Sequence, residues 1–494
     1  MNKLILSIDQ GTSSTKAVIL TVDGNIICDG RAKVNTDFPS LGFVEQNPEE
    51  IFQSVITAFK NSLSQLKLTG YKAADIQCCG ISNQRETFLL WDKDGKSLSN
   101  AVIWQCKRSI SICQELQNNS YKQFLRKRTG LFIDPYFSGT KLIWLYRNIE
   151  SIKAKIKKGE AFFGTIDTWL LYKLTGGKSY KTDYTNASRT LLFNLKDLQW
   201  DRDILNKFKL SRLNLPEVCP SAFNFGESSF NGLLKKKVPI TAMIGDSHAA
   251  SFGERCFKRG SAKATMGTGS SILLNTEDYI EPEKTSMVST ICWSTEKQIA
   301  YALEGVIVSC GSTINWLIEK LHLIKDGKEA NEISESLVDN GNVYLIPAFS
   351  GLGAPWWKMK QKAFITGLTF GSDHRHIVRA GLESIVFQVT DVIKAMENDT
   401  GNPLTSLQID GGVSSSSFVS TSIANLNNTK IIRCNVKEAS AIGAALLAGL
   451  KSGIYSSIDE LQRLDYNNEM ILPDNNKAIT YSYEKWLSIV KELK

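Results

Sequence analysis

The stretch Leu4-Ile-Leu-Ser-Ile-Asp9-Gln-Gly-Thr-Ser-Ser-Thr-Lys16-Ala-Val-Ile-Leu20 decides the fold. Two apolar runs of β type flank a short turn of glycine and hydroxyl residues. Gly11 lets the backbone approach an anion closely, and Asp9 is suited to hold Mg²⁺ through water. The residues whose N–H groups and hydroxyls can hold phosphate oxygens are Thr12, Ser13 and Ser14. The stretch predicts either a phosphate-binding hairpin or an ordinary hairpin with a polar turn.

The composition is that of a large globular protein. The chain has 494 residues, of which 42% are hydrophobic and 22% charged, enough for two sizeable cores. The net charge of +8 is a mild bias over this length. Residues 153–158 and 235–237 are the densest basic runs, and such runs are more typical of solvated surface than of nucleic-acid binding. We therefore expect no nucleic-acid partner.

The cysteines and the apolar runs indicate the cellular compartment in which the protein is expected. Ten cysteines are scattered without a Cys-x-x-Cys pair beside only four histidines, so a zinc site is not expected. Free cysteines fit a reducing compartment. The apolar run before Asp9 is too short for a signal peptide, and residues 439–450 are too short to span a bilayer. We expect a cytoplasmic protein without integral membrane association.

Strand-like runs alternate with amphipathic helical stretches, which favours an α/β fold. The periodicity predicts helices over residues 47–66 and 377–396, and strands over residues 76–81, 87–91, 239–244 and 404–409. The stretch Ser261-Ala-Lys-Ala-Thr-Met-Gly-Thr-Gly-Ser-Ser-Ile-Leu-Leu274 echoes the first hairpin. Two duplicated domains facing each other across a cleft would place the two turns on opposite sides of one triphosphate. We set the boundary near residue 250, which gives domains 1–250 and 251–494.

Two further glycine-rich segments are candidate nucleotide loops. The turn at residues 266–271 contains Gly267 and Thr268, and its alternative interpretation is a flexible hairpin. The segment Ile409-Asp-Gly-Gly-Val-Ser-Ser-Ser-Ser417 predicts a strand followed by a helix start, where N–H groups and the helix dipole favour an anion. Serine runs are also common in linkers, so a linker is the alternative interpretation of residues 409–417.

A candidate catalytic base and a candidate polyol site complete the pattern. Asp246 follows the apolar run 239–244, at the strand edge where open α/β sheets bind ligands, and it can accept the proton of an attacking hydroxyl. Its alternative role is a helix cap. Arg85 and Glu86 can bind neighbouring hydroxyls, although surface ion pairs look the same. Trp104 and Tyr136 add aromatic faces for the carbons of a polyol, although core packing is their commoner role.

Together these segments resemble the FGGY family of carbohydrate kinases, and within it the glycerol kinases, over nearly the whole chain. The matching segments are Asp9-Gln-Gly-Thr-Ser-Ser-Thr-Lys16, Gly80-Ile-Ser-Asn-Gln-Arg-Glu-Thr87, Trp104-Gln105, Ile133-Asp-Pro-Tyr-Phe-Ser-Gly-Thr-Lys141, Asp167-Thr-Trp-Leu170, Thr182-Asp-Tyr-Thr-Asn-Ala-Ser-Arg-Thr190, Gly245-Asp246, Gly267-Thr-Gly269, Glu304-Gly305, Ala354-Pro355, Gly367-Leu-Thr369 and Asp410-Gly-Gly412. The resemblance implies two actin-like, ribonuclease-H-like domains around a central cleft that holds ATP and Mg²⁺.

The resemblance also implies an activity and a set of site residues. The expected reaction is ATP-dependent phosphorylation of a primary hydroxyl of a small polyol, with glycerol giving sn-glycerol 3-phosphate. The residues expected on the polyol are Arg85, Glu86, Trp104, Tyr136, Asp246 and Ser247, with Asp246 as the base. Those expected on the nucleotide are Thr12, Ser13, Ser14, Lys16, Gly267, Thr268, Gly311, Asn315, Gly412 and Ser416. Mg²⁺ is expected on Asp9 and Asp246.

Four positions depart from the pattern of the glycerol kinases. Ser247 stands where a glutamine is usual and Ser271 where an aromatic residue is usual. Both changes enlarge the acceptor pocket, so a tetritol, a pentitol or a ketose such as xylulose or ribulose is an alternative substrate. Asn315 and Ser416 stand where a glutamine and an asparagine are usual, on the adenine side.

Two other classes of protein stay open at this stage. An actin-type or chaperone-type ATPase shares the phosphate turns but does not require Arg85, Glu86, Trp104 and Tyr136 together. A degenerate member of the family would bind a sugar without phosphorylating it. The resemblance further suggests a homo-oligomer, either a dimer or a tetramer.

Overall fold

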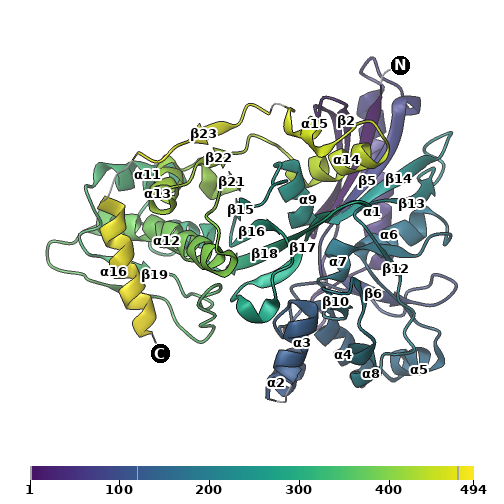
Figure 1. The fold of residues 1–494 in the computed structure, drawn as a ribbon, viewed down its shortest axis with the longest axis horizontal. Coiled ribbons are helices and arrows are strands. Elements are labelled where there is room, and N and C mark those ends of the chain that lie inside the picture. The colour runs from purple at the N-terminus through teal and green to yellow at the C-terminus, as the bar shows by residue number, and fades with distance from the viewer. Residues whose placement is uncertain (1–2, 119–120, 465, 475–477, 494) are drawn as a thin grey trace.

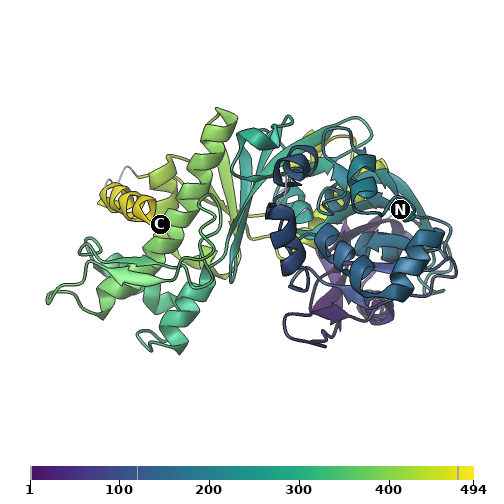
Figure 2. The ribbon, with the colours of Figure 1, turned by 90° about the horizontal axis from the view of Figure 1, so that it is seen from below.

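Two mixed sheets, one from each half of the chain, organise the fold in the computed structural model (Figure 1). The structure describes residues 3–118, 121–464, 466–474 and 478–493. We call the part built on the six-stranded sheet the N-terminal lobe and the part built on the seven-stranded sheet the C-terminal lobe. Seen from below, the lobes stand side by side (Figure 2). The predicted α/β class, with two sheet-based halves, is confirmed.

The first sheet has the strand order β13-β14-β5-β1-β2-β3. Its strands are β1 (Leu4–Gln10), β2 (Ser14–Thr21), β3 (Ile26–Lys33), β5 (Ile76–Asn83), β13 (Ala222–Ser228) and β14 (Val238–Gly245). β1 pairs with β2 antiparallel and with β5 parallel, so β1 lies in the middle of the sheet. A central strand is covered on both faces, which accounts for its nearly unbroken apolar run.

The second sheet has the strand order β17-β18-β16-β15-β21-β22-β23. Its strands are β15 (Ser261–Met266), β16 (Ser270–Glu277), β17 (Val288–Ser294), β18 (Ile299–Ile307), β21 (Ser406–Asp410), β22 (Ile431–Arg433) and β23 (Glu469–Ile471). The run β22-β21-β15-β16-β18 repeats the pairing of β14-β5-β1-β2-β3, including the antiparallel hairpin and the parallel neighbour. The echo that the sequence predicts is therefore a repeated topology.

Helices cover both faces of the first sheet. α1 (Pro48–Leu66) begins after Asn47, whose side chain accepts hydrogen bonds from Glu49 N and Glu50 N, so the predicted start is confirmed. The opposite face is covered by α14 (Ala439–Lys451), which comes from the C-terminal half of the chain. α14 packs against α9 (Asp246–Gly253) and β5, and the two helices lie together in Figure 1.

The C-terminal lobe is built around a long helix. α12 (His374–Thr400) is longer at both ends than the predicted 377–396, because Asp373 caps its first turn and Gly401 ends it with a φ of 67°. The other helices of this lobe are α10 (Gly311–Glu319), α11 (Gly327–Ser336), α13 (Ser417–Asn427) and α16 (Ala478–Glu492). The apolar faces of α12, α13 and α16 share one core with β15, β16 and β18.

The remaining elements are helices and short strands outside the two sheets. In the N-terminal half they are β4 (Glu45–Gln46), η1 (Ala73–Asp75), β6 (Phe88–Trp91), β7 (Ala101–Val102), α2 (Ile110–Asn118), α3 (Tyr121–Thr129), α4 (Ser138–Asn148), α5 (Glu150–Lys158), β8 (Phe162–Thr165), α6 (Ile166–Leu174), β9 (Lys181–Asp183), α7 (Tyr184–Ala187), β10 (Phe193–Asn194), β11 (Gln199–Trp200), α8 (Arg202–Lys207) and β12 (Glu217–Cys219). In the C-terminal half they are η2 (Pro282–Lys284), β19 (Tyr344–Ile346), β20 (Phe364–Thr366), η3 (Gly412–Ser415) and α15 (Ile458–Gln462).

The predicted strands 76–81, 87–91, 239–244 and 404–409 correspond to β5, β6, β14 and β21, with ends that differ by one or two residues. All ten cysteines are free thiols. Across the described ranges, the structure has no helix with the length and apolar character needed to cross a membrane.

Candidate active site

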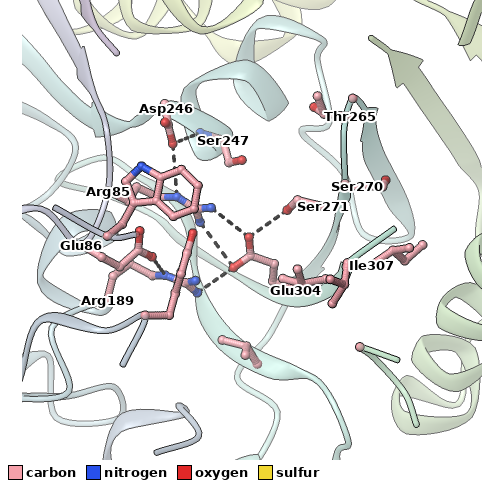
Figure 3. A pocket seen from close by; sticks show the side chains of 18 of the residues that line it. Arg85, Glu86, Arg189, Asp246, Ser247, Thr265, Ser270, Ser271, Glu304 and Ile307 are labelled. Atoms are coloured by element: carbon pink, nitrogen blue, oxygen red, sulfur yellow. Dashed lines mark hydrogen bonds and ion pairs between the residues drawn. The ribbon is translucent and has the colours of Figure 1, made fainter. Parts of the chain in front are cut away.

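A cleft with a volume of about 1830 Å³ lies between the two lobes. Its walls come from the β1–β2 turn, the residues after β5, the start of α9, the β15–β16 turn, the end of β21 and the start of α14. The carboxyl ends of β1, β5 and β14 therefore face the carboxyl ends of β15 and β21 across it. Figure 3 shows the part of the cleft that lies around Asp246.

Arg85 and Glu86 follow β5 and are almost completely buried in this part of the cleft. Glu86 adopts a φ of 62°, in the left-handed region that residues other than glycine seldom occupy. Gly245 leaves room for the Arg85 stem, since a Cβ at Gly245 would lie 2.7 Å from Arg85 Cγ. Burial raises the pKa of Glu86, although Arg189 and Arg85 offset part of that effect.

A buried network of ion pairs surrounds these two residues (Figure 3). Arg85 Nη2 lies 3.0 Å from Glu304 Oε1, and Arg189 Nη1 lies 2.6 Å from Glu304 Oε2. Arg189 Nε donates to Glu86 Oε1 at 2.6 Å. Burial raises the pKa of Glu304, but the two guanidinium groups outweigh burial and hold that pKa well below its usual range.

Asp246 is the first residue of α9, and Gly245 occupies the N-cap position. Its Oδ1 accepts a hydrogen bond from Ser247 N at 2.7 Å and lies 3.2 Å from Arg85 Nε. Gly245 rather than Asp246 therefore holds the N-cap position, although the Asp246 carboxylate accepts from one N–H of the first turn. The Asp246 side chain is 40% exposed and lines the cleft, so an incoming hydroxyl can reach it.

Ser271 and Ser247 both line the cleft, and Figure 3 shows Ser247 beside Asp246 and Ser271 beside Glu304. The Ser271 hydroxyl donates a hydrogen bond of 2.8 Å to Glu304 Oε1. The residue that the family pattern makes aromatic is thus part of the buried ion-pair network in this chain.

The aromatic pair lies beside this network. The rings of Trp104 and Tyr136 are 5.7 Å apart in a T-shaped arrangement, and both residues line the cleft. Trp104 Nε1 donates to Thr12 Oγ1 at 2.9 Å, which joins the aromatic wall to the β1–β2 turn. Burial raises the pKa of the Tyr136 hydroxyl well above its usual range, so Tyr136 is a neutral phenol at this site.

The first turn brings Asp9, Thr12 and Lys16 to the cleft. Gly11 N donates to Ser14 O at 3.0 Å and closes the turn. Lys16 Nζ forms an ion pair with Glu438, which precedes α14. Ser13 and Ser14 belong to the turn but are not among the residues that line the cleft.

The second turn brings Gly267 and Thr268 to the opposite wall of the cleft. Gly311, at the start of α10, packs against this turn: its N–H donates to Gly267 O at 2.8 Å, and a Cβ at Gly311 would lie 2.7 Å from that oxygen. The hairpin β15–β16 and the turn between its strands thus match the local prediction.

The third segment forms β21, the short helix η3 and then α13, as predicted. Gly411 and Ser414 line the cleft, whereas Gly412 lies between them and is not among the lining residues. Ser416 caps α13 and donates to Asn331 Oδ1 at 2.6 Å. Asn315 is exposed on α10 and is likewise not among the lining residues.

The residues present fit a magnesium ion. Asp9 and Asp246 both line the cleft, and burial raises the pKa of Asp9 to about 6, although Lys16 offsets part of that effect. Among the described residues, no group of three or more histidine, cysteine or acidic side chains has the geometry of a metal centre. Two carboxylates suit Mg²⁺, which keeps several waters and binds substrate phosphates.

Sequence reasoning missed several residues of the cleft. Glu304, Arg189, Lys263, Asp410 and Glu438 all line it and carry charge. Glu304 had a usable signal, because it is the one charged residue in the apolar strand β18, and charged residues are almost never fully buried unless they are paired.

Two family models match the chain. The N-terminal domain of the FGGY family of carbohydrate kinases matches residues 4–253, and its C-terminal domain matches residues 262–452. The chain is 41% identical to glycerol kinase 2 of Thermotoga maritima, over 99% of this chain and 98% of the relative. It is 42% identical to the glycerol kinase of Caldanaerobacter subterraneus subsp. tengcongensis, over 94% of this chain and 93% of the relative.

Solved structures resemble the whole molecule. The crystal structure of Plasmodium falciparum glycerol kinase with ADP superposes with a TM-score of 0.92 at 34% identity, over 100% of this chain and 99% of that chain. Ligand-bound xylulose kinase from Lactobacillus acidophilus has a TM-score of 0.88 at 22% identity, over 99% of this chain and 97% of that chain. The second likeness concerns the fold alone.

Proposed function

Because the chain belongs to the FGGY family of carbohydrate kinases, we propose that it transfers the γ-phosphoryl group of ATP to a primary hydroxyl of glycerol. The products are ADP and sn-glycerol 3-phosphate. The observation that carries the proposal is the junction of Asp246, Arg85 and Glu86 in one cleft that also contains both phosphate turns. The glycerol kinases among the relatives support glycerol as the acceptor.

In this proposal, the polar side of the acceptor meets Arg85, Glu86 and Ser247, while Trp104 and Tyr136 cover its carbon atoms. The guanidinium donates to acceptor oxygens and Glu86 accepts from an acceptor hydroxyl. The neutral Tyr136 hydroxyl can do either. The ion pairs already fix Arg85 and Glu86, so binding the acceptor costs little additional side-chain conformational entropy. Orientation of the two reactants then lowers the barrier.

Asp246 acts as the general base. It accepts the proton of the acceptor hydroxyl while the bond from that oxygen to the γ-phosphorus forms and the bond from this phosphorus to the bridging oxygen of ADP breaks. Its exposed carboxylate and its hydrogen bond from Ser247 N support this role, because one oxygen is held while the side chain stays open to the cleft.

The phosphate side uses Thr12, Lys16, Gly267 and Thr268, with N–H groups of the turns facing the phosphate oxygens. Ser13, Ser14 and Gly311 belong to the two turns or pack against them, and in this proposal Gly412, Ser416 and Asn315 would contact the nucleoside. Asp9 and Asp246 would hold Mg²⁺, which neutralises charge on the transferring phosphoryl group.

We further propose that residues 1–250 and 251–494 act as the two functional domains, that the protein works in the cytoplasm, and that it forms a dimer or a tetramer. The two family-model matches meet between residues 253 and 262, which supports the boundary. Free thiols at all ten cysteines support a reducing compartment.

The test measures ADP formation with and without glycerol, with erythritol and xylitol as further acceptors. We expect glycerol-dependent ADP formation, and a loss of ~10²- to 10⁴-fold in kcat for Asp246→Asn. Asp197→Asn, at an exposed position outside the cleft, is the matched control. Turnover of Asp246→Asn at the wild-type rate would contradict the role of the base.

A further inference from the structure

We propose that Glu304 is a positioning residue that aims Arg85 at the acceptor and makes acceptor binding depend on the C-terminal lobe. The proposal rests on the proposed function. Glu304 lies on β18, in the C-terminal lobe, whereas Arg85, Arg189 and Glu86 belong to the N-terminal lobe. Its carboxylate is fully buried, accepts hydrogen bonds from the Arg85 guanidinium and forms an ion pair with Arg189.

The Arg85 guanidinium contacts two carboxylates. Nη1 and Nη2 donate to Glu304 at 3.3 and 3.0 Å, while Nε lies 3.2 Å from Asp246 Oδ1 (Figure 3). Glu304 therefore fixes the plane of the guanidinium and determines which edge meets Asp246. This matters because Arg85 and Asp246 are the residues proposed to orient and deprotonate the acceptor.

The charge balance indicates what the loss of Glu304 does. Arg85 and Arg189 are both buried, and Glu304 is the carboxylate that they share. Without it, Asp246 is the carboxylate that remains in contact with Arg85 within the described part of the chain. An unpaired buried cation is strongly unfavourable, so we expect Arg85 to pair more closely with Asp246. Arg85 then competes with the acceptor hydroxyl for the Asp246 carboxylate.

Glu304 is held firmly in the C-terminal lobe. β18 pairs with β16 on one side and β17 on the other, and Ser271 of β16 donates to the carboxylate at 2.8 Å. The next residue, Gly305, packs so closely that a Cβ there would lie 2.5 Å from Val392 Cγ1 on α12. The Glu304 carboxylate thus moves together with the C-terminal sheet. A movement of one lobe relative to the other would therefore change the position of Arg85 through this ion pair.

The test compares Glu304→Gln with the wild type in steady-state kinetics and in calorimetry of ATP binding. We expect the KM for glycerol to rise by ~10-fold or more and kcat to fall, with the Kd for ATP changed by less than ~2-fold. Glu304→Asp, which keeps the charge, should recover part of the loss. Glu383→Gln removes the carboxylate of another buried pair, with Arg379 on α12, and should leave both KM values near those of the wild type.

Ser271→Ala provides a second measurement if Glu304→Gln does not fold. It removes one donor to Glu304, and we expect the KM for glycerol to rise by ~3-fold. The inference is overturned if the wild type shows glycerol-dependent turnover but neither variant changes the KM for glycerol, or if ATP binding falls equally. A wild type without glycerol-dependent turnover would instead contradict the proposed function itself.

Discussion

Trp104 Nε1 donates a hydrogen bond of 2.9 Å to Thr12 Oγ1, so the aromatic wall of the cleft is fixed to the β1–β2 turn. Thr12 also accepts a hydrogen bond from Gln46 Nε2 at its carbonyl oxygen, which anchors the turn to β4. In the proposed reaction, the side chain that packs on the acceptor and the turn that binds phosphate therefore move as one unit.

This hydrogen bond gives the first prediction. Thr12→Val keeps the shape of the side chain but removes the acceptor of the indole N–H, and we expect kcat/KM for glycerol to fall by ~5-fold. Thr12→Ser keeps the hydroxyl and should stay within ~2-fold of the wild type. Steady-state kinetics with both substrates varied is the measurement, and equal rates for the valine and serine variants would argue against the link.

Lys16 gives the second prediction, because its ammonium group lies in the cleft beside Glu438. Lys16→Gln removes a charged partner of the phosphates and should weaken ATP binding by ~10-fold or more in calorimetry. The matched control is Arg31→Gln, since Arg31 pairs with the same Glu438 at 2.8 Å but its side chain is 56% exposed. Weakening of ATP binding by the control to the same extent would show that Glu438, and not Lys16, is the important group.

The third prediction concerns the contact between α9 and α14. A Cβ at Gly443 would lie 1.7 Å from Ala249 O, so Gly443→Ala forces the helices apart and should destabilise the protein by ~1–3 kcal/mol. At Gly327, no heavy atom lies within 4 Å of a built Cβ, and Gly327→Ala should be neutral or slightly stabilising. Denaturant unfolding measures both, and equal stabilities would contradict the close packing of the helices.

The fourth prediction concerns pH. Burial, together with the neighbouring charge of Asp183, raises the pKa of Asp167 to about 7, although the hydroxyls of Thr165 and Thr182 offset part of the shift. The folded protein thus keeps a proton that the unfolded chain loses near pH 4, so the free energy of unfolding falls as pH rises from about 4 to 7. Asp167→Asn should reduce the fall between pH 5 and pH 8 by on the order of 2 kcal/mol. Urea unfolding at these two pH values measures this, and an unchanged fall would contradict the assignment.

Much of the fold follows from local patterns. The first hairpin, the capped start of α1 at Asn47 and the strand that ends before Asp246 were predictable because each depends on neighbouring residues. The path of α14 was not predictable in this way. Its small residues, such as Gly443 and Ala444, indicate close packing, but its partner is a sheet whose strands lie hundreds of residues earlier in the chain.

The candidate site likewise contains residues that could be predicted from the sequence and residues that could not. Arg85, Trp104, Tyr136 and Asp246 lie in distant segments, and the structure brings them to one cleft. Glu304 stands out in the sequence as the one charged residue of an apolar strand, but its pairing with Arg189 spans more than a hundred residues and could not be predicted. Ser271 could be predicted only as a smaller side chain in the pocket, whereas its hydrogen bond to Glu304 depends on the register of β16 and β18.

The central claim is phosphoryl transfer to glycerol, and ³¹P NMR of the protein with ATP, Mg²⁺ and glycerol tests it most directly. We predict that the phosphate-ester resonance of glycerol 3-phosphate grows in equal amount with ADP and that neither product accumulates when glycerol is left out. The formation of ADP with inorganic phosphate at the same rate with and without glycerol would contradict the account and indicate an ATPase.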